Sequence, residues 1–120
     1  MYQMLLAASL AGIVAAAEIQ DGAPEATERP PQKSPLFQMA ERFGRAAGNA
    51  EYCGFDDRDV ENFIVNAMAQ LAAQTDDQVL LAGSRIEFNA HAAYGRSEGP
   101  GDGCEAFELT FRRLRRGMDG

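Results

Sequence analysis

Three residues in the second half of the chain carry side chains that could do chemistry together. Ser84, Glu87 and His91 stand three and four residues apart, so on a helix they lie on one side. His91 is the only histidine of the chain. A serine, a histidine and a carboxylate are the parts of a nucleophilic hydrolase, and Glu87 with His91 is a pair of metal ligands at one-turn spacing.

The surrounding sequence supports neither chemistry. The amides around a serine inside a helix are already bonded, so no oxyanion donors stand beside Ser84. Catalytic zinc takes three protein ligands, and this spacing offers two. We therefore predict a non-enzyme with no catalytic residue and no metal site, and interpret this face as solvated. One alternative stays open, a helical protein that binds a small ligand or metal through Glu87, His91 and the methionines.

Two other segments also lack the context that their chemistry requires. "GDGCEA", residues 101–106, has the letters G-x-G-x-x-A of a dinucleotide site, but no strand precedes it. Asp56, Asp57, Asp59 and Glu61 resemble a cation site, yet acids in a first helical turn are favoured by the helix dipole. We predict no cofactor.

Composition limits the class of protein. The 120 residues suffice for one domain, and 46% hydrophobic with 24% charged residues is typical of a folded chain. The net charge of −7, from 18 acids and 11 bases, repels phosphate backbones. Nucleic acid is therefore excluded as an expected partner.

The first 17 residues have the pattern of an export signal. An apolar run, "LLAASLAGIVAAA" at residues 5–17, ends in three alanines, and cleavage there would leave Glu18 as the first residue. The preceding "MYQM" carries no Lys or Arg. We predict a signal peptide at 1–17 and a periplasmic or secreted protein. Two alternatives stay open: an uncleaved anchor, which would give the protein a membrane contact, and a cytoplasmic start.

The rest of the chain divides into a linker and a domain. Residues 18–35 hold four of the five prolines and no apolar periodicity, which predicts a flexible linker. Residues 36–120 show helical periodicity and predict an all-α, four-helix up-down bundle.

Three of the four helices have one clear inner face. The first begins at Leu36 and ends at "YCG", where Gly54 follows the cap, and its alanines suggest close helix approach. The second is capped by Asp56 or Asp57, and the fourth begins at Asp102 or Cys104. The predicted inner faces are Leu36, Met39, Ala40, Phe43, Ala47 and Ala50; then Val60, Phe63, Ile64, Ala67, Met68 and Leu71; and finally Cys104, Phe107, Phe111, Leu114 and Met118.

The third helix, about residues 76–95 with Thr75 or Asp76 as cap, has two apolar faces. We expect the inner face to consist of Val79, Ala82, Gly83, Ile86, Ala90 and Tyr94. Leu81, Phe88 and Ala92 lie nearly opposite that face. A helix with two apolar faces either lies between other elements or exposes one face to a partner, and both readings stay open. Leu81, Phe88 and Ala92 are our first candidate partner-binding residues.

A basic end is the second candidate partner-binding surface. "FRRLRRG" at residues 111–117 contributes Arg112, Arg113, Arg115 and Arg116 on an otherwise acidic chain. Cations also suit the C-terminus of a helix without any partner, and that alternative stays open.

The two cysteines are expected at the same end of the bundle. Cys53 ends the first helix and Cys104 begins the fourth, and an up-down topology brings these two ends together. In an exported protein such a pair predicts a disulfide, whereas two free thiols would fit a cytoplasmic protein.

The order of these features resembles a family of small exported proteobacterial helical proteins with one cysteine pair, a family without a characterised function. The order is a signal peptide, a Pro-rich spacer, a helix ending in "YCG", a helix with "FNAHAAY" and a cysteine opening the last helix. The plan is also similar in outline to periplasmic acid-stress chaperones. The family brings no established activity to this chain. The function that we predict is a non-enzymatic accessory protein that binds another envelope protein, as a small subunit of a larger assembly. This prediction rests on the linker, the expected disulfide, the second apolar face of the third helix and the basic end.

Overall fold

A computed structural model describes residues 33–119 of the chain. These residues form four helices and no strand: α1 (Pro35–Tyr52), α2 (Asp57–Ala73), α3 (Gln78–Glu98) and α4 (Cys104–Asp119). The all-α, four-helix prediction is thereby confirmed. The predicted signal peptide, and the linker up to residue 32, lie outside the described residues. Within 33–119, no helix has both the length and the apolar character needed to cross a membrane.

The first three helices begin at side-chain caps. The Ser34 hydroxyl accepts the amide of Phe37 at 3.2 Å, and Pro35 follows at the first helical position. Asp56 caps α2, as one of the two predicted residues. The predicted cap of α3 is wrong, because Asp77 caps that helix. The Thr75 hydroxyl instead accepts the amide of Asp77 at 3.0 Å, and Thr75 lies two residues before the cap.

The end of α1 turns the chain toward α2. Gly54 adopts φ 71°, a left-handed conformation that suits glycine. The amide of Phe55 donates to the Ala50 carbonyl at 3.0 Å, and that of Gly54 to Glu51 at 3.1 Å. This is the Schellman pattern, so the predicted role of Gly54 is confirmed.

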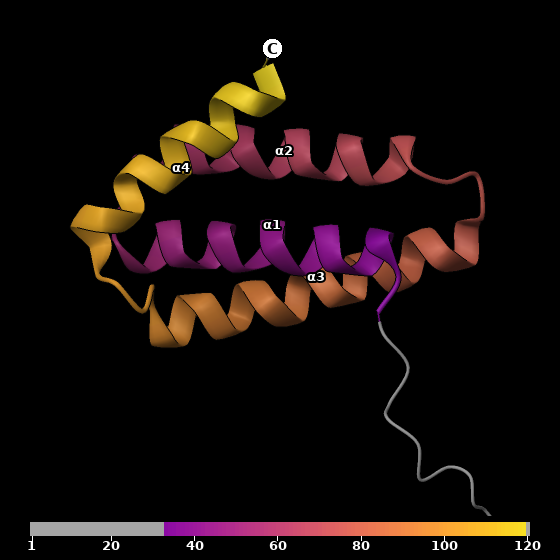
Figure 1. The fold of residues 1–120 in the computed structure, drawn as a ribbon, viewed down its shortest axis with the longest axis horizontal. Helices are drawn as coiled ribbons and strands as arrows, with labels where there is room; N and C mark the ends of the chain where they lie inside the picture. Colours follow the sequence, from indigo (N-terminus) through magenta and orange to yellow (C-terminus); the bar gives the residue numbers. More distant parts are fainter. Residues whose placement is uncertain (1–32, 120) are drawn as a thin grey trace, which may run out of the picture. The chain divides into compact units, whose positions relative to one another are not determined.

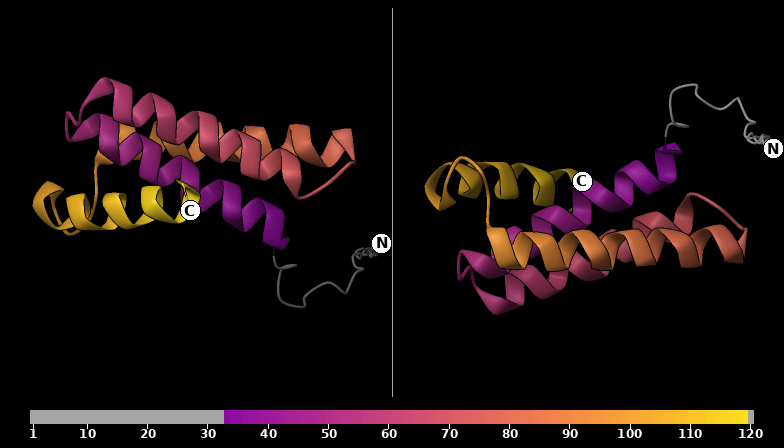
Figure 2. Two further views of the ribbon diagram at one scale, coloured as in Figure 1. Left: turned by 90° about the horizontal axis from the view of Figure 1, so that it is seen from above. Right: turned by 90° about the horizontal axis from the view of Figure 1, so that it is seen from below.

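α1 is the central helix of the domain. In Figure 1 it lies between α2 and α3, running parallel to α3 and antiparallel to α2. Both views in Figure 2 show it crossing α3 obliquely. α4 packs against α1 and α2 but not against α3. The four helices are therefore not equivalent, and α1 is buried on more than one side.

Glycines allow α1 and α3 to approach closely. A Cβ atom on Gly44 would lie 2.3 Å from the backbone oxygen of Phe88, and one on Gly48 would lie 2.1 Å from that of Ala92. From the other helix, a Cβ on Gly95 would lie 2.7 Å from the backbone oxygen of Arg45. No side chain fits at these three positions without separating the helices.

The predicted inner faces of α1, α2 and α4 are confirmed. Phe63 of α2 contacts Phe43 of α1 and Phe111 of α4, with ring centroids 6.0 and 5.1 Å apart. Phe55, between α1 and α2, packs on Phe107 and Phe111 at 5.9 and 5.5 Å. These ring contacts join α4 to α2 and to the residues at the end of α1.

The predicted disulfide is present in the structure. Cys53 and Cys104 are joined, with Cα atoms 5.6 Å apart and a separation of 51 positions in sequence. No free cysteine remains. The bond joins the end of α1 to the start of α4, and Cys53 packs against the hydrophobic core.

The two faces of α3 are the reverse of what we expected. Leu81, Phe88 and Ala92 are buried, with 6%, 3% and 6% of their surface exposed, whereas Val79 and Ile86 are 79% and 68% exposed. Of the two readings left open for Leu81, Phe88 and Ala92, burial is the one that the structure bears out, and these side chains are not exposed to a partner. Both faces are apolar, but only the buried one presents the backbone of Phe88 and Ala92 to the glycines of α1. The inner face of α3 is therefore determined by how closely its backbone can approach the glycines of α1, and not by which face is more hydrophobic.

Candidate functional site

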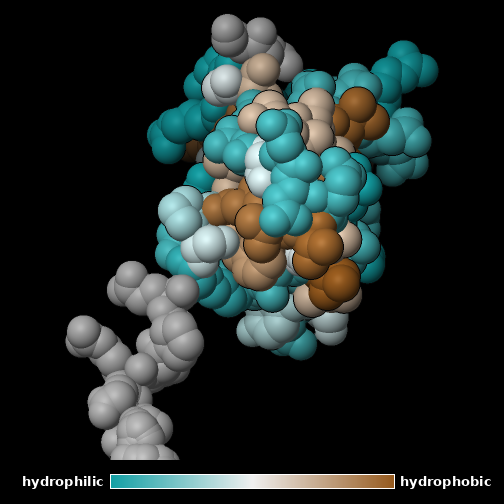
Figure 3. All heavy atoms as spheres, turned by 90° about the vertical axis from the view of Figure 1, so that its right-hand side faces the viewer, coloured by the Kyte–Doolittle hydropathy of each residue, from teal (hydrophilic) through white to brown (hydrophobic). Residues whose placement is uncertain are grey.

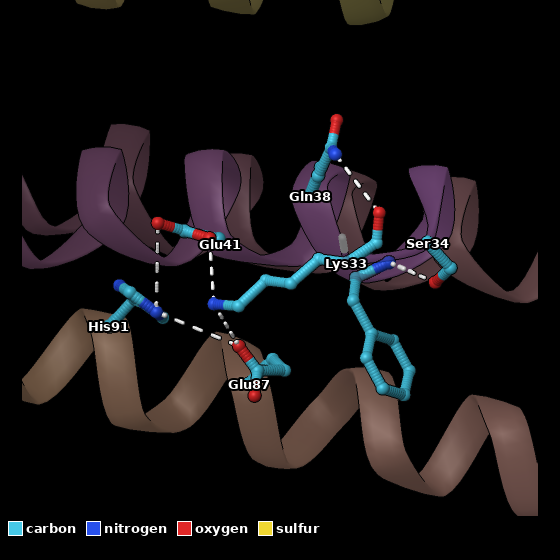
Figure 4. Close-up of polar contacts among 7 residues, drawn as sticks. Lys33, Ser34, Gln38, Glu41, Glu87 and His91 are labelled. Carbon is cyan, nitrogen blue, oxygen red and sulfur yellow. Dashed lines mark hydrogen bonds and ion pairs between the residues drawn. The ribbon is translucent and has the colours of Figure 1, made fainter. Parts of the chain in front are cut away.

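Two features of the domain are candidate sites: a polar cluster between α1 and α3, and the outer face of α3. The polar cluster consists of Lys33, Glu41, Glu87 and His91. Glu41 projects from α1, and Glu87 and His91 project from successive turns of α3 (Figure 4). Because α1 and α3 cross closely, the side chain of Glu41 meets those of Glu87 and His91, although Glu41 is far from both in sequence.

Lys33 lies between the two carboxylates of the polar cluster. Its Nζ donates to Glu41 Oε1 at 2.9 Å and to Glu87 Oε1 at 3.0 Å (Figure 4). His91 Nε2 faces the same two residues, 3.6 Å from Glu87 Oε1 and 3.9 Å from Glu41 Oε2. Those two distances are too long for hydrogen bonds. His91 Nδ1 is buried and has no hydrogen-bond partner among the described residues.

Proton affinities in the polar cluster follow these contacts. The hydrogen bonds to Glu41 and Glu87 raise the pKa of Lys33 above its ordinary value. The hydrogen bond from Lys33 lowers the pKa of Glu41, outweighing the opposing effect of burial. The Lys33–Glu41 pair is therefore charged on both sides over a wide range of pH.

The polar cluster does not include Ser84. This serine is fully buried, and its hydroxyl donates to the Leu81 carbonyl at 2.7 Å. A hydroxyl so placed contacts neither solvent nor His91, and it serves to satisfy a polar group in the core. A nucleophilic serine must reach its substrate, and Ser84 has no exposed surface through which to do so.

The outer face of α3 is an exposed apolar surface. It comprises Val79, Ala82, Ile86, Ala90 and Ala93, all of which are exposed. Val79 and Ile86 are seven residues apart, which is two turns, so they stand in line along the helix. Figure 3 views the end of the domain where α3 begins, and apolar surface gathers in its lower half. Leu80, 47% exposed, adds to the apolar surface of this first turn.

The four arginines of α4 are not equivalent. Arg112 pairs with Glu108 one turn earlier, and Arg115 reaches Asp59 of α2 at 3.3 Å. The guanidinium of Arg115 also lies 5.8 Å from the ring centroid of Phe111. Arg113 and Arg116 are exposed and form no ion pair within residues 33–119. Of the four arginines, these two are the ones that no ion pair of the described helices engages.

Sequence reasoning missed Glu41 as a member of the polar cluster. Glu41 is not part of the predicted inner stripe of Ala40 and Phe43, so spacing along the first helix gave no reason to group it with Glu87 and His91. The available signal was the pair Gly44 and Gly48, two small residues one turn apart, which marks a face where another helix comes close. Glu41 flanks that face.

Comparison with protein-family models, with curated proteins and with solved structures finds no match to this chain.

Proposed function

We propose that this chain is a non-enzymatic interaction protein of the periplasm or cell exterior, which binds another envelope protein through the outer face of α3. One observation carries the proposal: Val79 and Ile86 expose most of their apolar surface on one line of a helix. Water contact with such a line is unfavourable, and contiguous apolar surface of this kind is typical of binding sites.

The form of this face indicates what it would bind. The other residues of this face are the small Ala82, Ala90 and Ala93, so the face admits a second helix at short distance. A partner helix with its own apolar stripe therefore fits best. The disulfide supports the location, because such bonds persist in oxidising compartments.

The experiment compares the parent protein with a double variant of the outer face of α3 and with a control variant on α2. Val79→Ser combined with Ile86→Ser should lower partner affinity by about 10-fold or more, since central apolar anchors typically cost over about 1 kcal/mol each when truncated. Thermal stability should stay unchanged, because both side chains are exposed. Val65→Ser on α2 is the matched control, since Val65 is also 62% exposed but lies on another helix. Equal capture of a defined envelope partner by all three proteins would refute this surface.

Arg113 and Arg116 support a second binding surface. Both are exposed and unpaired within the described helices, so charge attraction to an acidic partner remains available to them. Charged residues at the edge of a protein–protein interface mainly change the association rate and its salt dependence. Arg113→Gln with Arg116→Gln should slow association at low salt, whereas Arg112→Gln, which loses only a local pair, should not.

A further inference from the structure

The polar cluster contains three metal-ligating groups in one place. One ligand atom from each of Glu41, Glu87 and His91 can be chosen so that all lie within 4.8 Å of one another, and all three residues are partly buried. The sequence offered only the pair on α3, and the third ligand comes from α1. Three protein ligands with an open fourth position are the usual composition of a zinc site that also binds water.

The separations suit a single ion. Zinc bonds of 2.0–2.2 Å place tetrahedral ligand atoms about 3.4 Å apart. His91 Nε2 already stands 3.6 Å from a Glu87 oxygen and 3.9 Å from a Glu41 oxygen. Small side-chain rotations would close these distances, and the helices need not move. Their positions are fixed by the glycine contacts a few residues away.

The Lys33 ammonium group lies where a metal ion would bind. The neighbouring carboxylates of Glu41 and Glu87 repel one another, and the Lys33 Nζ lies between them, 2.9 Å from Glu41 and 3.0 Å from Glu87. Lys33 belongs to the segment before α1, outside any helix, so its side chain can leave without breaking secondary structure. The imidazole, by contrast, forms no hydrogen bond through either nitrogen within residues 33–119. Its Nε2 is therefore available to a metal.

We propose that Glu41, Glu87 and His91 bind one divalent transition-metal ion, with Zn²⁺ as the best fit, and that the ion displaces Lys33. The imidazole selects against Mg²⁺ and Ca²⁺, which prefer oxygen ligands only. Loss of these contacts frees the Lys33 side chain from Glu41 and Glu87. The metal ion and the Lys33 ammonium thus compete for the same two carboxylates.

The single histidine gives a direct measurement. Zn²⁺ is added to the untagged full chain while the His91 imidazole resonances are followed by NMR, with calorimetry for affinity. We expect the resonances to shift and saturate at one equivalent, and Mg²⁺ or Ca²⁺ to leave them unchanged. Glu41→Gln and Glu87→Gln should each weaken Zn²⁺ binding about 10-fold or more. Mutating a residue that only supports a metal ligand already costs about 10-fold in affinity, so losing a ligand should cost at least as much.

Two further variants separate a site from adventitious binding. Lys33→Met keeps the aliphatic stem, removes the competing charge and should tighten Zn²⁺ binding several-fold. Glu61→Gln, at an exposed position of α2, should leave the affinity unchanged. The proposal is overturned if His91 does not respond at one equivalent of Zn²⁺. It is also overturned if the Glu41 and Glu87 variants bind like the parent, or if Lys33→Met weakens binding. Loss of this site would leave the outer face of α3, and its test, unaffected.

Discussion

At the scale of single residues, Phe88 and Ile86 show how differently two apolar side chains of one helix can act. Phe88 is 3% exposed and packs where α1 crosses α3, whereas Ile86 is 68% exposed. We predict that Phe88→Ala lowers the free energy of unfolding by about 3–5 kcal/mol, through lost burial and the cavity left behind. Ile86→Ala should change it by no more than about 0.5 kcal/mol.

Chemical denaturation of the two variants tests this prediction directly. Equal, small losses from both would mean that the Phe88 side chain is not part of the core. Equal, large losses would mean that Ile86 is covered within the folded domain, and the outer face of α3 would then not be a free surface.

The Lys33–Glu41 pair predicts a pH dependence. The pKa of Glu41 is lowered in the folded state, so its contribution to stability is present above the unfolded pKa and is lost as the pH falls through the folded one. The pKa of Lys33 is raised, so its contribution is present below the unfolded value and is lost as the pH rises through the folded one. The Lys33–Glu41 pair therefore stabilises the domain at every pH between the acid range, where Glu41 gains a proton, and the alkaline range, where Lys33 loses one.

We predict that Glu41→Gln makes stability fall less steeply in the acid range than it does for the parent. The effect should be small, because both side chains are partly exposed to solvent. Thermal melts from pH 6 down to about pH 3, with Glu61→Gln as the control, measure it. Parallel acid profiles for the parent and Glu41→Gln would show that the pair contributes nothing.

At the scale of elements, the contact of α1 with α3 depends on the absence of side chains. We predict that Gly48→Ala destabilises the domain by several kcal/mol, because its Cβ would lie 2.1 Å from the Ala92 backbone oxygen and the helices must move apart. Gly117→Ala is the matched control. Gly117 also lies inside a helix, α4, but nothing stands within 4 Å of its Cβ position, so alanine there should stabilise by up to about 1 kcal/mol.

Opposite signs for the two glycine substitutions in thermal melts would establish that close approach, and not helix propensity, fixes this pair of helices. Stabilisation by both would mean that propensity governs both positions. The close approach would then be of little energetic weight.

The sequence was informative wherever one helix face was clearly apolar and the other polar. The stripes through Phe63 on α2 and through Phe107 and Phe111 on α4 were predicted from spacing and are buried. The caps Asp56 and Gly54 were predicted from side-chain and backbone preferences, which act locally. Local interactions and simple periodicity can be read from one segment at a time, and these features needed nothing more.

The inner face of α3 and the polar cluster required knowledge of the neighbouring helix. Periodicity gave α3 two apolar faces, and only the glycines of α1 decide between Phe88 and Ile86. Glu41 joins Glu87 and His91 through the same crossing. Side-chain pattern describes one helix at a time, whereas the angle and separation of two helices depend on shape at their contact.

At the scale of the whole domain, α4 is held differently from the other helices. It has no contact with α3, and its single apolar stripe meets α1 and α2 through Phe107 and Phe111. The disulfide ties its first residue to the end of α1. The first three helices share a central core on α1, so α4 is the element that depends most on the covalent bond.

We predict that Cys53→Ser with Cys104→Ser lowers the free energy of unfolding by about 2–4 kcal/mol, the usual cost of losing a disulfide from a small domain. Hydrogen exchange should identify where the loss is felt. Amides of α4 should exchange faster by a larger factor than those of α3, because α4 can open while α1, α2 and α3 stay packed. Parent protein treated with a reductant should behave like the double variant. A uniform acceleration across all four helices would instead mean that the domain opens as one unit, and that α4 is as firmly packed as the rest.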